Sequence, residues 1–180
     1  MSYKECDAIN LIDKSFDDYP KNPKENNMNI LHTYCPNMNC SSDEEKIISG
    51  FIMLLNMIGE ESLESDQIVQ YASLWLSHKL NQKKEIGTTN LYDFYTENIE
   101  KNSCYEGNIP TDSSSKINID VIEKKIKSMD IDIKDISNFY DAFKSLCNMY
   151  SEINAENNTE CKTCLENAGE FFEKCEKVKN

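Results

Sequence analysis

Apolar residues recur along this chain at intervals of three and four positions, which places them on one face of an α-helix. The clearest helical segment is 65–87, in which the apolar face is carried by Ile68, Ala72, Trp75, Leu76 and Leu80. Tyr71 and Leu74 flank this face and widen it, as is typical of a helix that is surrounded by others. We therefore expect Trp75, the single tryptophan, to lie at the centre of a helical core.

The same spacing predicts further helices, and no segment alternates with the period of two that a half-buried strand requires. Ser2 with Glu5, and Ser42 with Glu45, have the spacing of a capping box at the start of two of them. We predict one all-α domain over residues 1–180, with about six to eight helices. The helical segments are 2–19, 42–59, 65–87, 89–99, 119–129, 132–153 and 161–178, with a shorter helical turn at 28–34.

Two segments between these helices are predicted to be loops. The sequence CPNMNC, residues 35–40, contains a proline and two asparagines, which favour turns. Residues 102–116 contain Gly107, Pro110 and four serines, and form the clearest loop of the chain. We expect this second loop to be mobile.

The charge of the chain argues against two classes of partner. Acidic residues number 32 against 19 basic ones, all of them lysines, and the formal net charge is −13. A nucleic-acid partner requires a positive surface and commonly arginine, and an anionic lipid surface requires clustered basic residues. The strongest apolar run, 47–59, is too short to span a bilayer, and the N-terminal residues contain no apolar signal-peptide core. We expect neither nucleic-acid binding nor membrane attachment through these residues.

Eight cysteines in 180 residues indicate an oxidising compartment and up to four disulfides. The alternative is a set of buried free thiols in a reducing cytoplasm. The spacing of the cysteines does not choose among the possible pairings, so the connectivity stays open.

Cys161 and Cys164 form a CxxC motif, which could be a redox pair or half of a zinc site completed by Cys35 and Cys40. A structural role is favoured, because no βαβ pattern accompanies the motif and the two cysteine pairs lie far apart in the sequence. His32 lies close to Cys35, which suggests a Cys/His nucleophile, although an ordinary polar side chain is the simpler interpretation.

No sequence pattern of a phosphate-binding loop, a nucleophile elbow or a zinc protease is present, so we expect neither an enzyme nor a cofactor. His78 is expected at the edge of its helix. Acceptor sequons for N-glycosylation occur at Asn39 and Asn157, and such short motifs arise easily in an asparagine-rich chain.

Several separated motifs resemble one family in the same order along the chain. They are YCPNMNCSSDEEKIISGFIMLL, YASLWLSHKLNQK, LYDFYTENIEKN, ISNFYDAFKSLCNMYSE and CKTCLENAGEFFEK. Together they resemble the Plasmodium interspersed repeat (PIR) proteins, which include the cir, bir and yir variant antigens of rodent malaria parasites. The resemblance covers nearly all of residues 6–177.

The resemblance implies a variant antigen that is exported to the surface or membrane of the infected erythrocyte and is involved in host interaction and immune evasion. Family members continue into one transmembrane helix and a cytoplasmic tail, so the chain resembles the ectodomain alone, and members often lack a cleavable signal peptide. Six cysteines fall on the family's positions: Cys6, Cys35, Cys40, Cys147, Cys161 and Cys164. Cys104 and Cys175 look like additions, which form an extra bridge or remain free.

The expected function is therefore that of a non-enzymatic ectodomain whose partner is a host cell-surface protein or an antibody. One alternative is an adhesin with one defined host receptor, and a further alternative is a zinc or thiol-redox protein that uses its CxxC. The resemblance makes Tyr71, Leu74, Trp75, Leu76 and Leu80 a signature of the scaffold. We expect the binding surface on loops such as 102–116.

Overall fold

The structure is a computed structural model. It describes residues 3–19, 30–59, 63–105, 107–129, 132–155 and 164–179. Its α-helices are α1 (Tyr3–Asp17), α2 (Asp43–Gly59), α3 (Ser65–Gln82), α4 (Leu91–Tyr95), α5 (Ile119–Ser128), α6 (Ile133–Ala155) and α7 (Cys164–Lys179). Short 3₁₀ turns lie at Ile30–Tyr34, Pro36–Met38, Lys84–Ile86 and Ser103–Tyr105, and one π-helical turn lies at Thr96–Glu100. Within these ranges the chain forms no strand, which confirms the all-α fold.

Local sequence explains where α2 and α3 begin. The Glu45 backbone N–H donates to the Ser42 hydroxyl over 3.1 Å, as a capping box requires, whereas the Glu45 carboxylate accepts from the hydroxyl of Ser41. In α3 the N-cap residue is Glu64, and Glu64 and Gln67 form the reciprocal hydrogen bonds of the box. Side-chain oxygens near each first turn thus satisfy backbone donors that have no partner within the helix.

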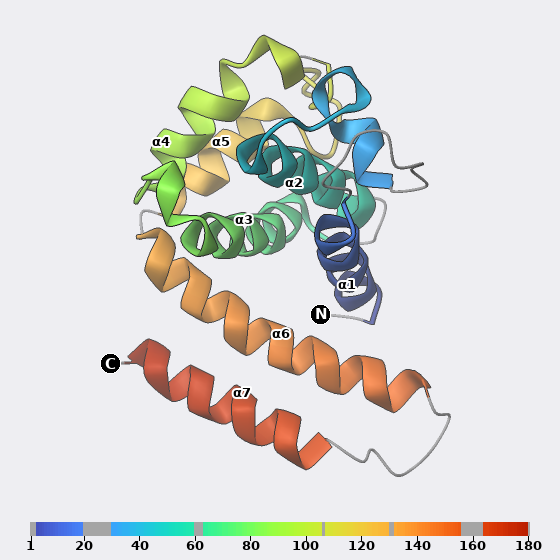
Figure 1. The fold of residues 1–180 in the computed structure, drawn as a ribbon, viewed down its shortest axis with the longest axis vertical. Coiled ribbons are helices and arrows are strands. Elements are labelled where there is room, and N and C mark those ends of the chain that lie inside the picture. Colours follow the sequence, from blue (N-terminus) through green and yellow to red (C-terminus); the bar gives the residue numbers. More distant parts are fainter. Residues whose placement is uncertain are drawn as a thin grey trace.

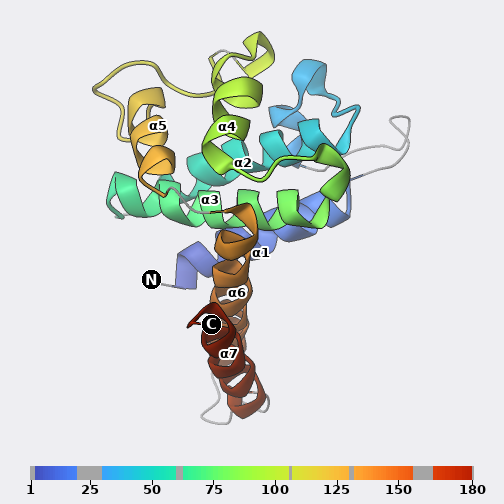
Figure 2. The same cartoon turned by 90° about the vertical axis from the view of Figure 1, so that its left-hand side faces the viewer.

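The helices form a body around α3 with a two-helix extension (Figures 1 and 2). Helix α3 packs against α2, α5 and α6, while α1 packs against α2 and α6. Helix α7 lies alongside α6, away from the rest of the body. In both views residues 30–42 and 96–118 lie at the opposite end of the molecule from α7, and we call this the distal end.

The core is centred on the contact between α2 and α3. Trp75 is fully buried, and Phe16 of α1 meets its ring edge-on with 5.9 Å between centroids. A Cβ at Gly50 would lie 3.0 Å from Trp75 Cζ3 and would overlap the ring, so α2 requires glycine at this close approach. Tyr71 and Leu74 are half-buried at the edge of the same helix.

The predicted loop after the π-helical turn is attached to the body at several points. Tyr105 and Ile109 are buried, and the Ile119 N–H donates to the carbonyl of Pro110 over 3.0 Å. Gly107 has a φ of 88°, in the left-handed region that glycine adopts without strain. The mobility expected for 102–116 stays a prediction.

Candidate interaction surface

A cluster of charged and polar side chains joins three helices around Asp13 of α1. Asp13 Oδ1 accepts a 2.9 Å hydrogen bond from Trp75 Nε1 and lies 3.1 Å from Lys79 Nζ, both on α3. Its other oxygen, Oδ2, accepts from Tyr140 Oη over 3.0 Å and from Lys144 Nζ over 2.6 Å, both on α6. Both oxygens of one carboxylate are therefore occupied by partners within the fold.

The electrostatics of this cluster fit a structural role. Burial acts to raise the pKa of Asp13, but the charge of Lys79 and the hydrogen bond and charge of Lys144 hold the pKa below its usual value. Burial beside Asp13 also raises the pKa of Tyr140, which keeps its hydroxyl a donor. A carboxylate paired in this way holds α1, α3 and α6 together and has no free oxygen for a substrate.

His78 of α3 faces α6 and is half-buried. Its Nδ1 is 3.3 Å from the Ser137 hydroxyl and 3.4 Å from Asp141 Oδ1, while its Nε2 is 2.9 Å from the Gln82 side-chain nitrogen. Burial lowers the pKa of His78 and Asp141 acts against that shift. Serine and aspartate meet the same ring nitrogen, so this group lacks the geometry of a Ser-His-Asp triad, in which they contact opposite nitrogens.

Two disulfides connect distant and neighbouring parts of the chain. Cys6 of α1 is bonded to Cys147 of α6, 141 residues away, and Cys35 is bonded to Cys40. These bridges confirm that the helical domain is disulfide-stapled. Among the described residues, Cys104 and Cys175 carry free thiols. Cys161 lies outside the described residues, and Cys164 is described only as the first residue of α7.

The Cys35–Cys40 bridge corrects two hypotheses drawn from the sequence. Cys35 has no free thiol to act with His32 as a nucleophile, and Cys35 and Cys40 offer no thiolates to complete a zinc site with the CxxC motif. Among the residues that the structure describes, no group of three or more His, Cys, Asp and Glu side chains could hold a metal ion. Nor does any described helix have the length and apolarity to cross a bilayer.

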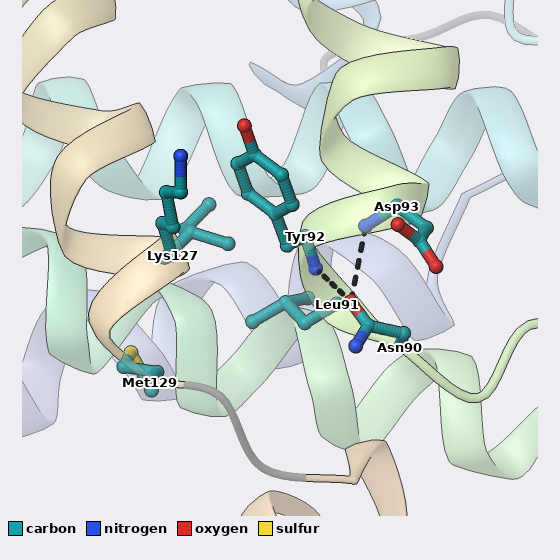
Figure 3. Close-up of a pocket in the computed structure, with 7 residues that line it drawn as sticks. Asn90, Leu91, Tyr92, Asp93, Lys127 and Met129 are labelled. Carbon is teal, nitrogen blue, oxygen red and sulfur yellow. Dashed lines mark hydrogen bonds between the residues drawn. The ribbon is translucent and has the colours of Figure 1, made fainter.

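A cavity of about 330 Å³ lies between α4 and α5, and Figure 3 shows the side chains that line it. Lys127 Nζ lies 5.5 Å from the centroid of the Tyr92 ring, and the Tyr92 hydroxyl donates to Glu123 over 2.9 Å. The Asn90 side chain accepts from the backbone N–H groups of Tyr92 and Asp93 and so caps α4. These polar groups already have partners in the protein, which argues against a dedicated ligand site.

A second cavity of about 330 Å³ lies at the distal end, beneath the predicted loop, and Ile99, Tyr105 and Ile119 contribute to its walls. Burial raises the pKa of Tyr105 to about 12, and the hydroxyl of Ser49 acts in the opposite direction. Ser49 also lies 3.4 Å from Cys40 Sγ. Ser49 of α2 thus contacts the Cys35–Cys40 loop.

The segment 30–42, which contains the Cys35–Cys40 loop, exposes two large apolar side chains. Met38, at the tip of the Cys35–Cys40 loop, is 57% exposed. Ile30, five residues before the loop, is 46% exposed. Asn39 is exposed too, and the hydroxyl of Ser41 in its sequon donates to Glu45. Asn157 of the second sequon lies outside the described residues. Turn-forming residues predicted only a loop at 35–40, although residues 30–42 contain no Asp, Glu or Lys, which is a signal that the sequence does carry.

Comparison with known proteins identifies what the chain resembles. Residues 6–180 match the family model described as Plasmodium variant antigen protein Cir/Yir/Bir. Among solved structures, the chain is similar to a Plasmodium PIR protein ectodomain, with 34% sequence identity and a TM-score of 0.71. This likeness covers 98% of the present chain and 79% of the other. No curated protein matches the sequence.

Proposed function

The chain belongs to the Plasmodium variant antigen family Cir/Yir/Bir, and from this membership we propose that it is a non-enzymatic ectodomain that faces host molecules and antibodies at the infected erythrocyte. The observation that carries the proposal is the family match over residues 6–180, together with the shared architecture of a PIR ectodomain. Host contact, immune evasion and export to the erythrocyte are parts of the proposal.

The arrangement of polar groups supports a binding module. The buried polar cluster around Asp13 has partners within the fold, and the polar groups of the cavity beside Tyr92 are likewise paired. Two of the exposed large apolar side chains, Ile30 and Met38, lie at the distal end, where a partner could cover them. This distribution fits recognition by surface contact better than chemistry in a cleft.

Surface labelling tests the proposed location. Antibodies raised against the folded domain should stain intact infected erythrocytes, and mild external proteolysis should remove the stain. An antibody to a cytosolic parasite protein is the matched control and should stain permeabilised cells only. Staining by the domain antibody that requires permeabilisation would contradict exposure at the host-cell surface.

The adhesin alternative, with one defined host receptor, is favoured by the apolar tip of the Cys35–Cys40 loop. The purified domain should then bind a host cell type saturably, and unlabelled domain should compete with labelled domain. Failure to bind any host cell type would count against the adhesin.

A further inference from the structure

We propose that residues 30–42 form a docking loop that inserts Met38 into an apolar pocket of a host protein whose rim is basic. The inference rests on the proposed function and specifies its surface and the chemistry of its partner. It begins from exposure: Met38 is 57% and Ile30 46% exposed, while Leu31, Cys35 and Cys40 are buried beneath them. The loop thus exposes two large apolar side chains among uncharged polar ones, and it is anchored on its inner side.

Charge distinguishes this apolar surface from the others on the molecule. Residues 30–42 contain no Asp, Glu or Lys, although charged residues make up 28% of the chain. Among the described residues, the other exposed large apolar side chains each have a charged residue within two positions in the sequence; they are Leu11, Phe139 and Phe172. Depletion of charge around exposed apolar side chains is typical of the core of a protein interface.

The backbone of the loop is fixed before any partner binds. Asn37 has φ 50° and Met38 has φ 57°, in a left-handed region that asparagine tolerates and that is unfavourable for methionine. The Cys35–Cys40 bridge closes the loop, and the Met38 N–H donates to the carbonyl of Cys35 over 3.0 Å. The Cys40 N–H donates to the Tyr19 hydroxyl over 2.8 Å, which attaches the loop to the end of α1. A loop held in this way loses little conformational entropy on binding.

Acidic residues flank the uncharged loop and indicate the charge of the partner. Asp43, Glu44 and Glu45 follow it directly in the first turn of α2, and Asp17 and Asp18 are exposed at the end of α1, next to Tyr19. Among the described residues, Lys46 and Lys83 both pair with Asp43, so these two lysines offset only part of the charge of the five acidic residues. A complementary surface would place Lys or Arg around an apolar pocket.

The test uses fluorescent tetramers of the domain on uninfected erythrocytes and peripheral white cells. Met38→Asp should weaken saturable binding by at least about tenfold, since a charge would enter an apolar pocket. Phe172→Asp is the matched control, because Phe172 is 66% exposed on α7, far from the loop, and this variant should bind as the wild type does. Raising the salt concentration should weaken wild-type binding by screening the acidic flank.

The possible outcomes separate the docking loop from the proposed binding to host cells. Wild-type binding that Met38→Asp leaves unchanged, or that Phe172→Asp reduces equally, would overturn the docking loop and leave host binding intact. Absence of wild-type binding to every cell tested would overturn the host contact and the docking loop together, whereas surface staining of infected cells tests location independently. Circular dichroism and an intact Cys35–Cys40 bridge establish that Met38→Asp is folded, and Met38→Ala, which should also bind less tightly, provides a milder variant.

Discussion

Asp13 shows at the scale of a single residue how this fold tolerates charge in its interior. Its carboxylate is mostly buried, with an 18% exposed side chain, and its ion-pair partner Lys79 is 8% exposed. Burying an isolated charge is costly, but the pairing with Lys79 and Lys144 and the hydrogen bonds from Trp75 and Tyr140 offset that cost. Loss of the carboxylate would leave Lys79 buried without its counter-charge.

We therefore expect Asp13→Asn to lower the free energy of unfolding by about 3 kcal/mol, measured by chemical denaturation at neutral pH. Asp43→Asn is the control: Asp43 pairs with Lys83, but its side chain is 43% exposed, and the loss should stay below about 1 kcal/mol. Equal losses in the two variants would contradict the structural role assigned to Asp13.

Asp13 also makes the free energy of unfolding depend on pH. The folded-state pKa of Asp13 lies below the ordinary value of 3.8, so the unfolded chain takes up this proton at a higher pH than the folded one. The stabilisation by ionised Asp13 is fully present at pH values above 3.8. It is lost as the pH falls through the lower pKa that Asp13 has in the folded state. Acid titration of unfolding should consequently show a steeper loss in the wild type than in Asp13→Asn.

At the scale of elements, the two disulfides constrain the chain very differently. Cys6–Cys147 links α1 to α6 across 141 residues, whereas Cys35–Cys40 spans only 5. A crosslink restricts the unfolded chain more when it closes a longer loop. The first bridge is therefore expected to stabilise the domain, and the second to fix local loop geometry.

Replacing both cysteines of one bridge by serine separates these roles. Removal of Cys6–Cys147 should lower the free energy of unfolding by about 5 kcal/mol and removal of Cys35–Cys40 by about 2 kcal/mol on the loop-entropy model. Thermal and chemical denaturation of the two double variants measure the difference. A larger loss on removal of the short bridge would contradict this division.

At the scale of the whole molecule, thiol labelling shows which cysteines are free and which are in disulfides. Alkylation of folded, unreduced protein followed by peptide mapping should label Cys104, which is exposed, faster than the half-buried Cys175. The four cysteines of the two bridges should stay unlabelled, and the same map would report the state of Cys161 and Cys164. Labelling of all eight cysteines would contradict an oxidising compartment.

Much of the fold follows from periodicity, and much of the surface does not. The three- and four-residue spacing placed Ile68, Trp75 and Leu80 on one buried face, because a helix carries its side chains in a fixed rotation. The same rule cannot identify Asp13 as the partner of Lys79, since the two residues lie on different helices and meet only through packing. The N-cap of α3 likewise depends on side-chain pairing, because Glu64 and Gln67 form reciprocal hydrogen bonds.

The sequence by itself determined the all-α fold, the burial of Trp75, the even cysteine count and, through its motifs, the family. Tertiary structure alone decided which cysteines meet, because pairing depends on the distance between helices and not on spacing along the chain. It also decided that Asn37 and Met38 adopt left-handed backbone conformations in a closed loop and that the Met38 side chain points outward. Local propensity does not predict this conformation for Met38, because the bridge and the contact of Cys40 with Tyr19 impose it.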